Sequence, residues 1–219
     1  MNRFILGAIL VCSSLVKPAA AHMVWLERNG DGVQLFFGEY AENLRERSGG
    51  HLDLIAAPRL VGAVAPSSRQ EDHVAFAPPP EGDARATDQL APWTDRARGG
   101  RTRSVYLARE GRAETRAALD LELVPTVPGG DTFTLLFRET PLRRAKVVLI
   151  GPPGWSKELN TDAEGSVVLP TPWAGRYVAE VQHVDNVAGG QEAAAYDRTS
   201  YVSTLSFTTG AGIPWAAQR

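Results

Sequence analysis

The chain has 219 residues, of which 43% are hydrophobic and 22% are charged. This composition is typical of a globular protein with one large domain or two small ones, and it excludes a disordered or collagen-like chain. The 23 basic and 25 acidic residues give a net charge of −2, so there is no basic excess to bind a phosphate backbone, and we expect no nucleic-acid partner. The 21 glycines and 15 prolines indicate many short strands joined by turns.

Residues 1–21 have the layout of a secretory signal peptide. Arg3 precedes the mainly apolar run Phe4 to Val16, and Ala19-Ala20-Ala21 is a small-residue cleavage signal. The run is too short to cross a bilayer core of about 30 Å as a helix, so a retained membrane anchor is the less favoured alternative. We expect an exported, periplasmic protein with no membrane span after processing. Cleavage would also remove Cys12, the only cysteine, and with it any disulfide or thiolate metal site.

Residues 22–116 are predicted to form an N-terminal β subdomain that starts with a hairpin. Met23 to Arg28 and Val33 to Tyr40 are strand-like, and they flank the turn signal Asn29-Gly30-Asp31-Gly32.

Less regular structure is expected in the rest of this subdomain. Ala41 to Arg47 fits one or two helical turns, and His51 to Val64 fits a pair of short strands. Residues 65–104 are poor in periodicity and contain several prolines and glycines, which predicts a long loop with one strand near His73 to Phe76. Seven arginines between Arg96 and Arg116 are interleaved with acids; we expect a solvated face there, with an anion-binding patch as the alternative.

Residues 117–209 are predicted to form an antiparallel, immunoglobulin-like β-sandwich, followed by a C-terminal tail over residues 210–219. Six strand-like segments follow one another at regular spacing. They are Leu119 to Pro125, Asp131 to Arg138, Lys146 to Ile150, Val167 to Leu169, Arg176 to Val184 and Tyr201 to Thr208. The chain as a whole therefore predicts an all-β fold.

Several segments resemble a family of exported β-sandwich proteins. They are PGGDTFTLLFRETPLRRAKVVLIGPPG and LNTDAEGSVVLPTPWAGRYVAEVQH in the second half, and AHMVWLE and FFGEY near the start. Members of that family are assigned by similarity to periplasmic components of nickel or cobalt uptake. The resemblance implies a metal ion as cargo and a membrane transporter component as a partner.

The common catalytic motifs are absent from the sequence, which has no G-x-S-x-G, no H-E-x-x-H and no glycine-rich phosphate loop with lysine. The four histidines carry more information. If cleavage follows Ala21, His22 becomes the amino-terminal residue, and its α-amine and ring Nδ1 can chelate one metal ion. One further imidazole would complete the arrangement called a histidine brace, whose nitrogen donors suit copper, nickel or cobalt. The alternatives are cleavage elsewhere, or a His22 that only ends a strand.

The hairpin register supplies His22 with an acidic neighbour. Pairing Asn29 with Gly32 places Val24 opposite Phe37 and extends to His22 opposite Glu39. A three-residue loop is the alternative, and it would shift the register and place Gly38 or Tyr40 there instead of Glu39. Glu39 can orient the His22 ring as an outer-shell group, or bind the ion itself.

His183 is the favoured second imidazole, because it continues the alternating apolar row of Tyr177, Ala179 and Val181 at the end of a strand. A structural histidine is the alternative. Asp185 and Tyr201 are weaker candidates for ligands or outer-shell groups, as is Tyr196. His51 and His73 are expected to be exposed and are less favoured as ligands.

These patterns predict an exported protein that binds a transition-metal ion for uptake or delivery and is not an enzyme. Two other functions stay open. One is a copper-dependent oxidative enzyme built on the brace. The other is a metal-free sandwich that binds carbohydrate or protein.

Overall fold

The computed structural model describes residues 22–30, 32–62, 67–77, 81–152 and 154–214. Strands and three short 3-10 turns are the regular elements of these ranges, which confirms the all-β sandwich. The predicted signal peptide, residues 1–21, and the last five residues of the predicted tail lie outside the described residues. None of the described elements is a helix long and apolar enough to cross a membrane.

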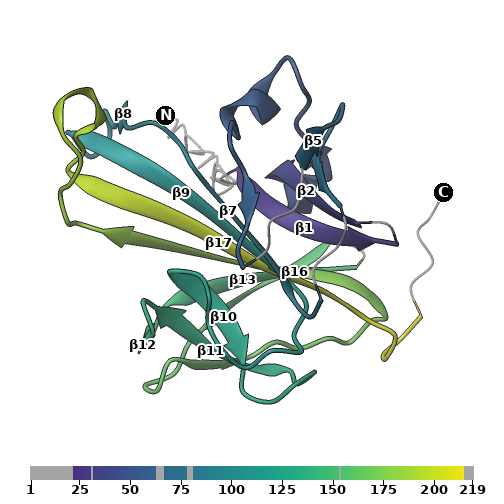
Figure 1. The fold of residues 1–219 in the computed structure, drawn as a ribbon. Coiled ribbons are helices and arrows are strands. Elements are labelled where there is room, and N and C mark those ends of the chain that lie inside the picture. The colour runs from purple at the N-terminus through teal and green to yellow at the C-terminus, as the bar shows by residue number, and fades with distance from the viewer. Residues whose placement is uncertain (1–21, 31, 63–66, 78–80, 153, 215–219) are drawn as a thin grey trace, which may run out of the picture.

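An eight-stranded sheet forms the middle layer of the molecule (Figure 1). Seven of its strands run in the spatial order β14-β13-β16-β17-β9-β7-β4, and β8 pairs with β9 at the side. Their bounds are β14 Trp155–Asn160, β13 Lys146–Gly151, β16 Gly175–Asp185, β17 Arg198–Thr209, β9 Arg101–Glu110, β7 Ala84–Gln89, β4 Arg59–Leu60 and β8 Trp93–Thr94. Neighbours are antiparallel except for β17 and β9, which are parallel. Both predicted subdomains contribute strands, because β9 precedes residue 117 and β17 follows it.

A five-stranded sheet lies on one face of the middle layer. It contains the predicted hairpin, and its strands are β1 Met23–Asn29, β2 Gly32–Glu39, β6 Val74–Phe76, β5 Ser67–Arg69 and β3 Leu44–Arg45. The hairpin register is the predicted one, since Asn29 pairs with Gly32 and Val24 with Phe37.

A four-stranded sheet covers the opposite face (Figure 1). Its strands are β10 Leu121–Pro125, β11 Thr132–Phe137, β12 Thr140–Pro141 and β15 Ser166–Val168. The core between this sheet and the middle layer contains Leu121, Phe133, Tyr177, Leu205 and Phe207.

β17 is buried on both faces because it lies between the two outer sheets. Ser203 donates a hydrogen bond to the carbonyl of Leu121 in the four-stranded sheet. On the other face, Thr204 and Ser206 donate to the carbonyls of Val24 and Leu26 in β1, the edge strand of the five-stranded sheet. The hydroxyl groups therefore satisfy edge carbonyls that have no strand partner on that side.

Four predictions about the N-terminal half need correction. The helical turns expected over Ala41 to Arg47 are reduced to one 3-10 turn, η1 Tyr40–Glu42, followed by β3. Instead of a first strand after His51, the chain forms the 3-10 turn η2 His51–Leu54, whose Leu52 is buried. In a 3-10 turn, every third side chain lies on the same side and can be buried, whereas a half-buried strand needs hydrophobic and polar residues to alternate.

The long loop expected over residues 65–104 contains β7 and the start of β9. Hydrophobic alternation did not reveal these strands, because several of their buried positions are polar or charged, including Arg85, Asp88 and Thr102. Arg109 is fully buried as well, so it does not belong to the solvated face expected for the arginine-rich segment. It forms ion pairs with the buried acids Asp83 and Glu122.

Candidate metal centre

His22 lies immediately before β1, at the open end of the hairpin. Its Nδ1 is 3.6 Å from Oε1 of Glu39, the neighbour that the register predicts. The imidazole packs on the buried ring of Phe37, with 5.1 Å between the ring centroids. One side of the His22 ring is therefore covered by the core, and 30% of the side chain remains exposed.

Glu46 reaches His22 because β3 runs close beside β2. Gly38 of β2 pairs with Arg45, and its φ is 150°. A side chain at Gly38 would collide with the Leu44 carbonyl, so glycine permits this close approach. Directly after β3, the backbone N–H of Glu46 donates to the carbonyl of Phe37 at 2.8 Å, which fixes the glutamate beside the hairpin end.

His51 comes to the same place from η2. The burial of Leu52 and Ile55 anchors η2 on the core cluster that also contains Phe37. The His51 ring lies edge-on to that of His22, with centroids 5.7 Å apart. Three segments that are separate in sequence thus bring His22, Glu46 and His51 together.

One carboxylate oxygen lies between the two imidazoles. Oε1 of Glu46 is 2.6 Å from Nε2 of His22 and 3.2 Å from Nδ1 of His51. The hydrogen bond from His22 lowers the pKa of Glu46 below its usual value, despite partial desolvation, and His51 adds to this effect. Glu46 is therefore a carboxylate at neutral pH.

The donor atoms of these three residues all lie within 4.8 Å of one another, close enough to share one ion. Two imidazole nitrogens and a carboxylate oxygen suit divalent transition metals such as nickel, cobalt, copper and zinc. Glu39 faces the other nitrogen of His22 at 3.6 Å, where its negative charge favours this orientation of the ring.

Sequence reasoning identified one of these three residues as a favoured ligand and missed Glu46. Glu46 stands between Arg45 and Arg47 and has the pattern of a solvated helical turn. His51 is exposed as expected, with 67% of its side chain accessible, yet it faces the cluster. A short-range signal was the pair Gly49-Gly50 before His51, which allows a sharp turn back toward the hairpin.

The structure does not bring His183 to His22. His183 lies on β16, on the side whose residues Tyr177, Ala179 and Val181 face the four-stranded sheet. It packs on Phe137 of β11, with ring centroids 4.4 Å apart. His22 lies at the end of the five-stranded sheet, on the other face of the middle layer, so a shared site for these two histidines is not formed.

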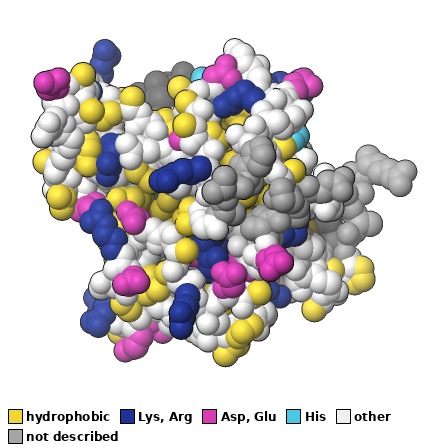
Figure 2. Space-filling view, in the orientation of Figure 1, with side chains coloured by type: hydrophobic (Ala, Val, Ile, Leu, Met, Phe, Trp, Pro, Cys, Tyr) yellow, Lys and Arg dark blue, Asp and Glu magenta, His cyan; other side chains and the backbone are white. Residues whose placement is uncertain are grey.

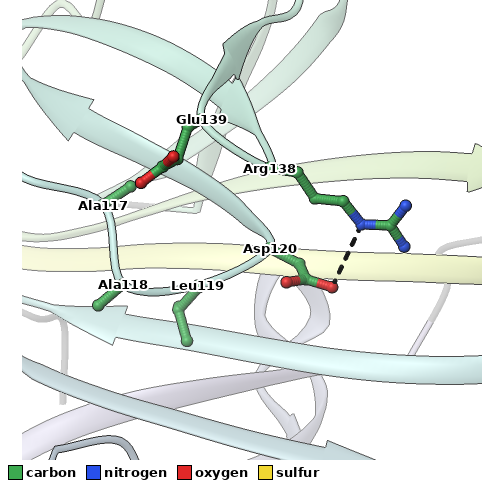
Figure 3. Close-up of a pocket in the computed structure, with 6 residues that line it drawn as sticks. All are labelled: Ala117, Ala118, Leu119, Asp120, Arg138 and Glu139. Carbon is green, nitrogen blue, oxygen red and sulfur yellow. Dashed lines mark ion pairs between the residues drawn. The ribbon is translucent and has the colours of Figure 1, made fainter.

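Asp185 and Tyr201, the other predicted candidates, lie near His183 and are bonded to Arg138. The arginine forms an ion pair with Asp185 at 3.0 Å and donates to the Tyr201 hydroxyl at 2.9 Å. The same hydroxyl donates to Asp120, which also faces Arg138 (Figure 3). The Arg138 guanidinium therefore already binds the Asp185 and Tyr201 oxygens that a metal ion would need as ligands.

A pocket of about 330 Å³ lies next to this arginine, between the segment before β10 and the β11–β12 turn. Asp120, Arg138 and Glu139 provide its charged groups (Figure 3).

The remaining candidates lie apart from the cluster. His73 is bonded through Nδ1 to Asp72 at 2.7 Å and lies 3.3 Å from the amide nitrogen of Gln34. Tyr196 stacks under the guanidinium of Arg103.

Figure 2 shows acidic and basic side chains interspersed over one face of the molecule, with histidine at the surface in its upper part.

Comparisons of the chain with models of protein families, with curated proteins and with solved structures find no match.

Proposed function

We propose that this protein binds a divalent transition-metal ion through His22, Glu46 and His51, as a carrier for metal uptake or delivery. The observation that supports this proposal is the convergence of two imidazoles on one ionised carboxylate oxygen. In the metal-free arrangement, the ring N–H groups share that oxygen. An ion would replace those protons and use the same three atoms.

The ring nitrogens of His22 distinguish this site from a histidine brace. A brace needs Nδ1 together with the α-amine of a processed chain, whereas Nε2 faces Glu46. Nδ1 faces Glu39 instead. The proposed cluster therefore needs His22 in the chain but does not need a free α-amine on it.

Export to the periplasm is a second part of the proposal. It rests on the signal-peptide pattern of residues 1–21 and on the resemblance to the exported uptake family. Mass spectrometry of the secreted protein would reveal a chain that begins at His22. A chain that retains residues 1–21 would contradict this part.

Isothermal titration with Ni(II), Co(II) and Cu(II) tests the metal site. We expect one ion per chain, and a loss of affinity of at least about tenfold for His22→Ala, Glu46→Gln and His51→Ala. The double variant His22→Ala/His51→Ala should lose less than the product of the single losses, because ligands of one ion are not independent.

Two histidines outside the cluster provide matched controls. His73→Ala removes an imidazole that also contacts an acid, and His183→Ala removes the one predicted from the sequence. Both variants should bind metal as the parent chain does. The absence of binding heat with every ion would overturn the proposal and favour a metal-free sandwich.

A further inference from the structure

The proposed site offers its donors from one side only. Among the described residues, the group of metal-binding side chains within reach of one another contains His22, Glu46 and His51. Glu39 does not extend this set, because it faces Nδ1 of His22 rather than Nε2.

The exposure of the three side chains shows which side is open. Glu46 is 16% exposed and His22 is 30% exposed, whereas His51 is 67% exposed. Phe37 covers the His22 ring from the core, and Leu52 anchors η2 beneath His51. An ion held here would have protein on one side and solvent on the other.

Divalent nickel and cobalt prefer more donors than this cluster supplies, since oxygen and nitrogen ligands commonly surround them in square-planar or octahedral shells. In an octahedral shell, three protein donors would leave half of the positions unfilled. Those positions point to solvent, where a second ligand can enter without displacing any side chain.

We propose that the site accepts its divalent ion as a complex with a small chelating ligand, which keeps the outward half of the coordination shell. This inference rests on the proposed function. The proposed cargo is a partly chelated ion, and its small ligand supplies donors such as carboxylates and amines. A fully chelated ion is excluded, because it has no position free for His22, Glu46 and His51.

Synthetic chelates of Ni(II) provide the test. Iminodiacetate leaves half of an octahedral shell free, and EDTA leaves none. We expect the parent chain to bind Ni(II)–iminodiacetate with an affinity within about tenfold of that for aqueous Ni(II), and to bind no Ni(II)–EDTA. Native mass spectrometry should find nickel and iminodiacetate together on one chain.

Variants show whether the chelate uses the same residues. His51→Ala and Glu46→Gln should weaken Ni(II)–iminodiacetate binding at least about tenfold, and the control His73→Ala should not.

Two results would overturn the inference while the metal site itself stands. In one, aqueous Ni(II) binds and the chelate does not. In the other, nickel is transferred to the protein and free iminodiacetate is released, which would show that the chelator does not keep the outward half of the shell. Failure of aqueous Ni(II) to bind would instead remove the proposed function and this inference together.

Discussion

Glu122 compensates the positive charge of two buried guanidinium groups, those of Arg85 and Arg109. Its carboxylate accepts from Nε of Arg85 at 2.7 Å and from Nη1 of Arg109 at 2.8 Å, and all three side chains are almost fully buried. Glu122→Ala would leave both guanidinium groups with less charge compensation. We expect the free energy of unfolding in urea to fall by about 3–5 kcal/mol.

An exposed ion pair provides the control for this variant. Glu158 and Lys146 are 3.0 Å apart and more than half exposed. Glu158→Ala should change the same free energy by less than about 1 kcal/mol. Equal effects of the two substitutions would show that the buried network contributes no more than a surface pair.

His183 gives the molecule a pH dependence of stability near neutrality. Desolvation lowers its pKa in the folded state, and Arg138 acts in the same direction, against the opposing effect of Asp185. An unfolded histidine titrates near about 6.5, so below that pH the unfolded chain binds a proton that the folded chain does not. Stability should therefore fall as the pH drops from about 7 through 6.5 and down to the folded pKa.

His183→Gln should remove this part of the pH dependence. Chemical denaturation at several pH values between about 5 and 7.5 measures it, with His73→Gln as the control that leaves His183 in place. The same slope in His183→Gln and in the parent chain would contradict the prediction. The lowered pKa of Glu46 acts in a separate range, since its contribution is lost only as the pH falls below about 4.5.

The contact between β1 and β17 depends on hydroxyl groups. Thr204→Val keeps the shape of the side chain and leaves the carbonyl of Val24 without its donor. We expect a loss of about 1–3 kcal/mol in the free energy of unfolding, the usual cost of an unsatisfied buried polar group. Thr208→Val, at an exposed position of the same strand, should be close to neutral. An unchanged stability for Thr204→Val would mean that water replaces the hydroxyl.

Individual elements with a local signal could be predicted from the sequence. The turn signal Asn29-Gly30-Asp31-Gly32 predicted the hairpin, and pairing Asn29 with Gly32 identified Glu39 as the neighbour of His22. Glu46 could not be found in this way, because its position depends on a two-residue strand, β3, and on the missing side chain of Gly38. Neither has a periodic pattern.

His183 shows that the hydrophobic periodicity of one strand cannot predict which sheets stack on its two faces. The alternation along β16 correctly placed His183 on a core-facing side. It could not show that a second sheet lies on the other face of the same strand and holds His22. That arrangement depends on the parallel pairing of β9 with β17, a contact between distant segments.

At the scale of the whole molecule, β17 determines when the protein can fold. Thr204 and Ser206 contact residues 180 positions earlier in the chain, and β17 also pairs with β9 and supports the four-stranded sheet. Neither outer sheet can bury its apolar face against a complete middle layer until this last strand is present. Contacts between such distant segments make folding slow. The chain therefore reaches its native state late and as one cooperative unit, and a chain cut before residue 198 would lack the strand that joins all three layers.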